Sequence, residues 1–134
     1  MSEGFYNPTV MDHFLNPRNV GEMEDADAVA EVSADGCAGD VLKLSLKIRN
    51  GKIEDARFKA LGCGAAIASS SMATLMIKGR SVREALAFSN LKVVEALGGL
   101  PPEKIQCSVL AEDAIKAALA KYFAKHPEAE ALKI

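Results

Sequence analysis

Residues 41–61 constrain the fold most, because they carry the pattern of a β-hairpin. In residues 41–49 (VLKLSLKIR), leucine and isoleucine alternate with lysine, serine and arginine, which is typical of a strand with one buried and one solvated face. Asn50 and Gly51 follow, and both tolerate the positive φ that a tight type I′ turn requires. Residues 53–61 alternate again, so the chain is predicted to return antiparallel to the first strand.

The alternation also predicts the register of this hairpin. A two-residue loop alone would place Leu46 opposite Asp55 and bring a charge into the core. We therefore expect a bulge or a longer loop near Glu54, which shifts the pairing by one residue. That shift keeps Ala56 and Phe58 on the apolar face of the returning strand.

The other segments predict one more strand and several helices. A short strand is expected over residues 28–33. A short amphipathic helix is expected to follow Pro8, and its apolar positions are Val10, Met11, Phe14 and Leu15. Further helices are expected over residues 65–78, from the capping box Ser81-Val82-Arg83-Glu84, over 90–98 and over about 108–125. Strands precede helices, which predicts an α+β fold with a small antiparallel sheet, several helices and a long C-terminal helix, in a single domain of residues 1–134.

Composition excludes several function classes. The 134 residues are 49% hydrophobic and 25% charged, as expected for a globular domain. A net charge of −2, no tryptophan and 5% aromatic residues argue against nucleic-acid or membrane-surface binding. The N-terminal residues lack a signal-peptide pattern, and no apolar run is long enough to span a bilayer, so we expect a cytoplasmic protein with reduced thiols.

The three cysteines are the candidate functional residues, since an odd number cannot form a closed disulfide framework. Cys37 precedes the first hairpin strand and Cys63 follows the second, so antiparallel pairing brings the two to the same end. Cys63 also opens a predicted helix, and Cys107 precedes the last one. A helix N-terminus favours the thiolate, which is the form that binds metal or attacks sulfur. Near Cys37, Asp40 is a candidate fourth ligand through its carboxylate oxygen.

The residues alone leave several interpretations of these thiols open. Free cysteines are often small buried residues, whereas a structural zinc site or a thioredoxin-type site would show a Cys-x-x-Cys pair, which is absent here. A Cys–His hydrolase would have only His13 and His126 to use. Thiolates bind iron–sulfur clusters as well as zinc, but a permanent cluster normally uses four cysteines. Three thiolates and a carboxylate therefore suggest a cluster or metal that is held in order to be passed on.

Five segments match a known family. They are residues 13–21 (HFLNPRNVG), 39–44 (GDVLKL), 53–58 (IEDARF), 62–71 (GCGAAIASSS) and 107–118 (CSVLAEDAIKAA). On these segments the chain resembles the IscU/NifU-type iron–sulfur cluster assembly scaffolds over nearly its whole length.

The resemblance implies a three-stranded antiparallel sheet and a [2Fe–2S] cluster assembled transiently at one end of the molecule, on a protein that is not itself an enzyme. A cysteine desulfurase would deliver sulfur as persulfide, and the cluster would pass to apo iron–sulfur proteins. By motif position, the implied ligands or sulfur acceptors are Cys37, Asp40, Cys63 and Cys107, with Lys104 and Gln106 beside them.

This chain departs from the family pattern at three places. Gln106 stands where many members have histidine, and because glutamine is a poorer metal ligand, Asp40 is preferred as the fourth ligand. The first motif, residues 37–40 (CAGD), is one residue longer than the usual Cys-Gly-Asp. Glu103 replaces an apolar residue in the stretch that resembles the chaperone-binding motif, which argues against recruitment of a dedicated Hsp70-type chaperone.

A zinc-containing sulfur acceptor that serves a cysteine desulfurase is the alternative function within the resemblance, and zinc could occupy the same ligands in the isolated protein. That branch of the family carries an insertion between its second and third cysteines, and none is evident between Cys63 and Cys107. The sequence leaves open whether two copies form a homodimer.

Overall fold

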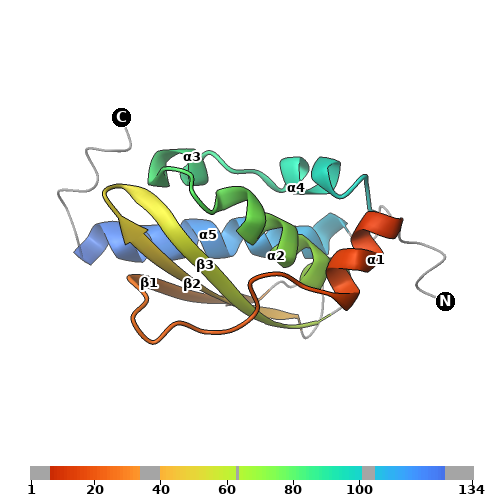
Figure 1. The fold of residues 1–134 in the computed structure, drawn as a ribbon, viewed down its shortest axis with the longest axis horizontal. Helices are drawn as coiled ribbons and strands as arrows, with labels where there is room; N and C mark the ends of the chain where they lie inside the picture. Colours follow the sequence, from red (N-terminus) through yellow and green to blue (C-terminus); the bar gives the residue numbers. More distant parts are fainter. Residues whose placement is uncertain (1–6, 34–39, 63, 101–104, 126–134) are drawn as a thin grey trace.

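A three-stranded antiparallel sheet with strand order β1-β2-β3 lies at the centre of the fold (Figure 1). The computed structural model describes residues 7–33, 40–62, 64–100 and 105–125, without the side chains of Gln106 and Cys107. Its strands are β1 (Ala28–Ser33), β2 (Val41–Arg49) and β3 (Lys52–Leu61). Its helices are α1 (Pro8–Leu15), α2 (Gly64–Ile77), α3 (Val82–Leu86), α4 (Asn90–Ala96) and α5 (Ile105–Lys125). The predicted α+β fold, with its small antiparallel sheet and long C-terminal helix, is confirmed.

The β2–β3 hairpin has the predicted turn and the predicted bulge. Asn50 and Gly51 have φ angles of 54° and 75°, in the left-handed region that this turn requires. The register shifts between Lys47 and Ile48, and Glu54 is the extra residue on the returning strand. The bulge therefore keeps acidic side chains off the apolar face of the sheet.

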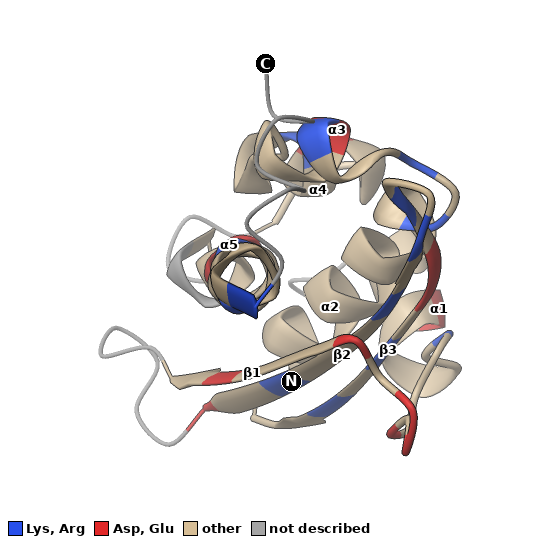
Figure 2. Ribbon diagram, turned by 90° about the vertical axis from the view of Figure 1, so that its left-hand side faces the viewer, with Lys and Arg blue, Asp and Glu red and all other residues tan. Residues whose placement is uncertain are grey.

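One face of the sheet carries the helical layer. Helix α5 packs on β1 and β2, α2 packs on β3, and α3 and α4 contact α5 from the outside (Figures 1 and 2). The largest fully buried side chains include Leu42, Leu46, Ile53, Ile77, Leu97, Leu110, Ile115 and Leu119. In the described part of the chain, no helix is long and apolar enough to cross a membrane.

Helix α2 lies between the sheet and the other helices, and small residues allow it to do so. It contacts α1, α4, α5 and β3. Its buried residues are mostly alanine and serine: Ala65, Ala66, Ala68, Ser69, Ser70, Ser71, Ala73, Thr74 and Ile77. Side chains of this size let neighbouring backbones approach closely, so α2 is covered on nearly every side.

The outer face of the sheet is less solvated than the alternation predicted. Ser45, expected on the solvated face, is only 2% exposed, and Lys43 and Lys47 are half-buried. The acidic connector of residues 22–27 lies over this face, where Glu22 pairs with Lys43 and Asp25 pairs with Lys47 (Figure 2). This face is less exposed than predicted for an electrostatic reason. The lysines of β2 form ion pairs with the acidic connector of residues 22–27.

Helix α1 buries a different side chain from those that its apolar spacing predicted. Val10 is fully buried as expected, but Leu15 is 65% exposed, and His13 lies in the interface with α2 instead. His13 Nδ1 shares a hydrogen bond of 2.7 Å with Ser71 Oγ, which also accepts the backbone N–H of Arg18 at 2.9 Å. A polar contact therefore joins α1 and its C-terminal turn to the middle of α2.

We predict that Asp27 stabilises the bulge. Its Oδ2 accepts the backbone N–H of Ile48 at 2.7 Å, directly beside the register shift. Asp27→Ala leaves this N–H without its partner and should lower the free energy of unfolding by about 1–3 kcal/mol, whereas Asp27→Asn keeps an acceptor and should retain most of it. Urea unfolding measures both. The control is Asp25→Ala, which breaks an exposed ion pair with Lys47 and should cost about 0–1 kcal/mol; equal losses would contradict the prediction.

We also predict that stability falls on mild acidification. Burial, and then the Arg18 charge, lower the pKa of His13 below its ordinary 6.5, although Asp12 opposes them. The unfolded chain therefore binds the proton more tightly than the folded chain. The contribution of neutral His13 is fully present above about pH 6.5 and is lost as pH falls through the lower folded-state pKa. Urea midpoints between pH 5 and 8 should show this slope, and His13→Gln should flatten it.

Candidate functional site

The site begins where β2 starts and β3 ends. Val41 lies opposite Leu61, so Asp40 and Gly62, the next residues outward, come together at one end of the sheet. A methyl group on Gly62 would lie only 2.5 Å from both Cγ and Oδ1 of Asp40. Asp40 is 6% exposed, so its carboxyl group is held against the Gly62 backbone at a place that has no room for a side chain.

Among the predicted ligands, the structure describes only the side chain of Asp40. Cys37 and Cys63 lie outside the described residues, as does Lys104, and the side chains of Gln106 and Cys107 are not described. In the sequence, Cys63 stands between Gly62 and the first residue of α2. The antiparallel pairing of β2 and β3, from which Cys37 and Cys63 were expected to lie at the same end, is present. That the three cysteines act together as ligands stays a prediction.

Helix α5 begins earlier than predicted. It starts at Ile105 rather than near residue 108, so the backbone of Cys107 belongs to its first turn instead of preceding it. A start near residue 108 would place the acidic Glu112 and Asp113 at the first turn, where negative charge is favourable. Glu112 is instead a tertiary contact, because its Oε1 accepts the backbone N–H of Asn90 at 2.7 Å.

Contacts that the sequence pattern did not predict hold the start of α5. Ser108 is fully buried; its Oγ donates to the Ile105 carbonyl at 2.6 Å and accepts from Asn90 Nδ2 at 3.1 Å. Burial raises the pKa of Glu112, but hydrogen bonds from Lys116 and the Asn90 N–H outweigh it and leave this pKa below its ordinary value. The helical spacing of Ser108 could have indicated its burial, because Ser108 lies on the same face of α5 as Ala111 and Ile115.

Two helix N-termini lie at the same end of the molecule as Asp40. In Figure 1 the end of β3, the first turn of α2 and the first turn of α5 are all on the right-hand side. Helices α2 and α5 also pack against each other. Helix N-termini carry partial positive charge and favour thiolates and other anions. This end of the fold can therefore hold anionic ligands around a cationic or metal-containing group.

His13, the histidine that the structure describes, is already hydrogen-bonded and so is not a free base or metal ligand for this site. His13 is engaged with Ser71 between α1 and α2, and His126 lies outside the described residues. Within the described side chains, no three His, Cys, Asp or Glu residues are grouped closely enough to hold a metal ion.

Comparison with known proteins places this arrangement in a family. Residues 5–129 match the model of the NifU-like N terminal domain. The chain belongs to this family. The resemblance read from the five motifs is thereby confirmed, and this NifU-like domain covers nearly all of the chain.

Relatives of this NifU-like domain carry names that describe one role. It is 48% identical over 128 residues to the iron-sulfur cluster assembly scaffold protein IscU 1 of Archaeoglobus fulgidus, covering 96% of this chain and 83% of that protein. It is 53% identical over 124 residues to the scaffold protein IscU of Escherichia coli, covering 90% and 95% respectively. A crystal structure from Fervidobacterium islandicum, titled a putative SUF-system scaffold, superposes with a TM-score of 0.69 at 21% identity over 89% of this chain and 99% of that one, which supports the fold.

We predict strong coupling between Gly62 and Asp40. Gly62→Ala should displace the Asp40 carboxyl group and lower the free energy of unfolding by about 1–3 kcal/mol, because the new methyl group overlaps Cγ and Oδ1. Combining it with Asp40→Ala removes both overlapping atoms. A double-mutant cycle from urea unfolding should give a favourable coupling of about 0.5–3 kcal/mol. Additive losses in the cycle would mean that the close approach does not constrain Gly62.

Proposed function

We propose that this chain is a scaffold on which an iron–sulfur cluster is assembled and from which the cluster passes to apo-proteins. The observation that carries the proposal is the similarity, at about half of all positions and over at least 90% of the chain, to proteins named as such scaffolds. The described end of the fold supports it, since a buried carboxylate and two helix N-termini lie at the same end of the molecule.

The cluster in this proposal is a [2Fe–2S] group, which is cargo rather than a resident cofactor. Cys37, Cys63 and Cys107 would supply soft thiolate ligands, and Asp40 would supply a hard oxygen. Iron in a thiolate-rich site holds such an oxygen less firmly, so an incoming thiol from a recipient protein would displace Asp40 first. The α2 and α5 N-termini, together with Lys104, would offset the negative charge of the ligated cluster, each helix by roughly 0.3–1 kcal/mol.

The proposed role requires partners rather than catalysis by the chain itself. A cysteine desulfurase would transfer persulfide sulfur to one of the cysteines, and the finished cluster would leave for an apo iron–sulfur protein. Both steps need reduced thiols, which fits a cytoplasmic setting. Gln106 would lie beside the cluster as a hydrogen-bonding neighbour rather than a ligand.

The test is anaerobic assembly on the purified full-length chain with ferric iron and sulfide, which together have the oxidation state of a [2Fe–2S] cluster. We expect visible absorption from sulfide-to-iron charge transfer, and equal amounts of iron and sulfide bound. Changing any one of Cys37, Cys63 and Cys107 to serine should lower cluster yield about tenfold, because a hydroxyl is a far harder and less acidic ligand than a thiol. Ser33→Ala, an exposed change at the end of β1, is the control and should assemble normally.

Two results would count against the proposal. Undiminished cluster yield in all three cysteine variants would remove the ligand assignment. A purified chain that holds zinc, accepts persulfide and forms no cluster would favour the zinc-containing sulfur acceptor instead. Zinc, iron and sulfide analysis of the same samples separates these outcomes.

A further inference from the structure

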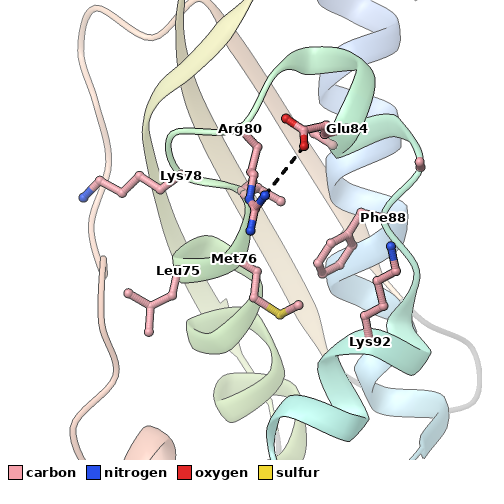
Figure 3. A pocket seen from close by; sticks show the side chains of 10 residues that line it. Leu75, Met76, Lys78, Arg80, Glu84, Phe88 and Lys92 are labelled. Atoms are coloured by element: carbon pink, nitrogen blue, oxygen red, sulfur yellow. Dashed lines mark ion pairs between the residues drawn. The ribbon is translucent and has the colours of Figure 1, made fainter.

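A pocket of about 420 Å³ lies at the far end of α2 from Cys63 (Figure 3). It forms where the last turn of α2 meets α3 and the first turn of α4, and it is open to solvent. Helix α2 has 14 residues, so at about 1.5 Å per residue the pocket lies roughly 20 Å from the proposed cluster end. It is therefore separate from the site described above.

The floor of the pocket is apolar. Phe88 is 6% exposed and Ala85 is 1% exposed, while Met76 is half-buried beside them. Ala87 lines the pocket too and is exposed. Figure 3 shows the thioether of Met76 and the ring of Phe88 on opposite sides of the hollow. A single aliphatic or aromatic side chain from a ligand would find apolar surface here.

The rim of the pocket carries more positive than negative charge. Lys78, Arg80 and Lys92 line it together with one acidic residue, Glu84, although the whole chain has a net charge of −2. Lys78 points away from the hollow and pairs with Asp55 at 3.2 Å, so it contributes least.

Arg80 and Lys92 are the two cations whose side chains lie at the hollow, and of the two only Arg80 has an acidic partner among the described residues. Arg80 Nη1 lies 3.6 Å from Glu84 Oε2, an ion pair too long to be a hydrogen bond. Lys92 forms no ion pair with any side chain in the described part of the chain. Glu84 is already used within α3, because its Oε1 accepts the Ser81 N–H at 3.1 Å in the capping box. The mouth of the pocket therefore favours a negatively charged ligand.

The pocket is held in shape by backbone hydrogen bonds to the hairpin. The Gly79 N–H donates to the Ile53 carbonyl at 2.7 Å, and the Ile53 N–H donates to the Arg80 carbonyl at 2.8 Å. The Val82 N–H donates to the Gly51 carbonyl at 2.9 Å. A pocket fixed in this way loses little conformational entropy when a ligand binds.

We propose that this pocket binds an acidic peptide segment of another protein. One apolar side chain of the peptide would pack against Met76 and Phe88, and neighbouring carboxylates would lie beside Arg80 and Lys92. We choose an acidic partner because the rim of the pocket is mostly positively charged. The pocket volume of about 420 Å³ suits one peptide side chain with its flanking backbone. The distance from the cluster end means that such a partner leaves Asp40 uncovered.

The probe is a fluorescein-labelled, end-blocked peptide of sequence Gly-Glu-Glu-Phe-Glu-Glu-Gly, titrated into the metal-free full-length chain. We expect saturable binding that weakens with added salt, and amide shifts in NMR spectra that concentrate on residues 75–92. Peptides with glycine in place of phenylalanine, or glutamine in place of glutamate, should each bind about five- to tenfold more weakly. Equal binding by either control peptide would overturn the proposal, because recognition would then lack one of its two elements.

Two variants of the chain test the location. Arg80→Ala combined with Lys92→Ala should weaken peptide binding about five- to tenfold. Ala87→Trp should also weaken peptide binding, because the indole would fill the mouth of the pocket while every charge is kept. The matched control, Lys121→Ala with Lys125→Ala, removes two exposed cations of α5 and should bind as the parent does.

Unchanged binding by both pocket variants would overturn the proposal, as would peptide-induced shifts at residues 40–62 instead. Shifts at residues 75–92 that appear on concentrating the chain without peptide would assign the pocket to a second copy and also overturn it. Cluster assembly is measured separately on the same variants and should be normal. A failure of this proposal is thus distinguishable from a failure of the proposed function.

Discussion

The antiparallel pairing of β2 with β3, in its shifted register, is the constraint on which the other features depend. At the open end of the hairpin it sets Asp40 against Gly62 and directs the chain into α2. At the turn end it presents Gly51 and Ile53 to the link between α2 and α3, which fixes the pocket wall. Because one ladder of hydrogen bonds determines both ends, a slip of one residue would disturb the cluster end and the pocket together.

The outer edge of β3 is covered by other segments of the chain, which prevents it from pairing with strands of other proteins. The backbone of Phe58 donates to the Asn19 carbonyl and accepts from the Gly21 N–H, so the segment after α1 covers the middle of this edge. The link of residues 79–82 covers its beginning through Ile53. Unpaired strand edges invite pairing with other chains, and both coverings satisfy backbone groups that would otherwise do so.

Local rules were enough to predict the parts of the fold that local chemistry decides. The turn and the bulge follow from Asn50-Gly51 and from the cost of burying Asp55, so they could be read from the sequence. The burial of Ser45 and of His13 could not, because each depends on a segment distant in the chain. The start of α5 was misplaced for the same reason. Glu112 accepts the backbone N–H of Asn90 at the start of α4 and does not lie in the first turn of α5. At the site, the motifs supplied all four proposed ligands, and the structure describes the surroundings of Asp40 alone.

The small side chains of α2 have a consequence for how such a chain can change over generations. A larger residue at Ala68 or Ser69 would meet neighbours on every side and would cost about 1–3 kcal/mol, so the middle of this helix has almost no freedom to vary. Its last turn and the residue after it are different, because Leu75 and Lys78 are exposed. Mutation can therefore alter the surface proposed to bind a partner at one end of the helix without changing the packing of its middle.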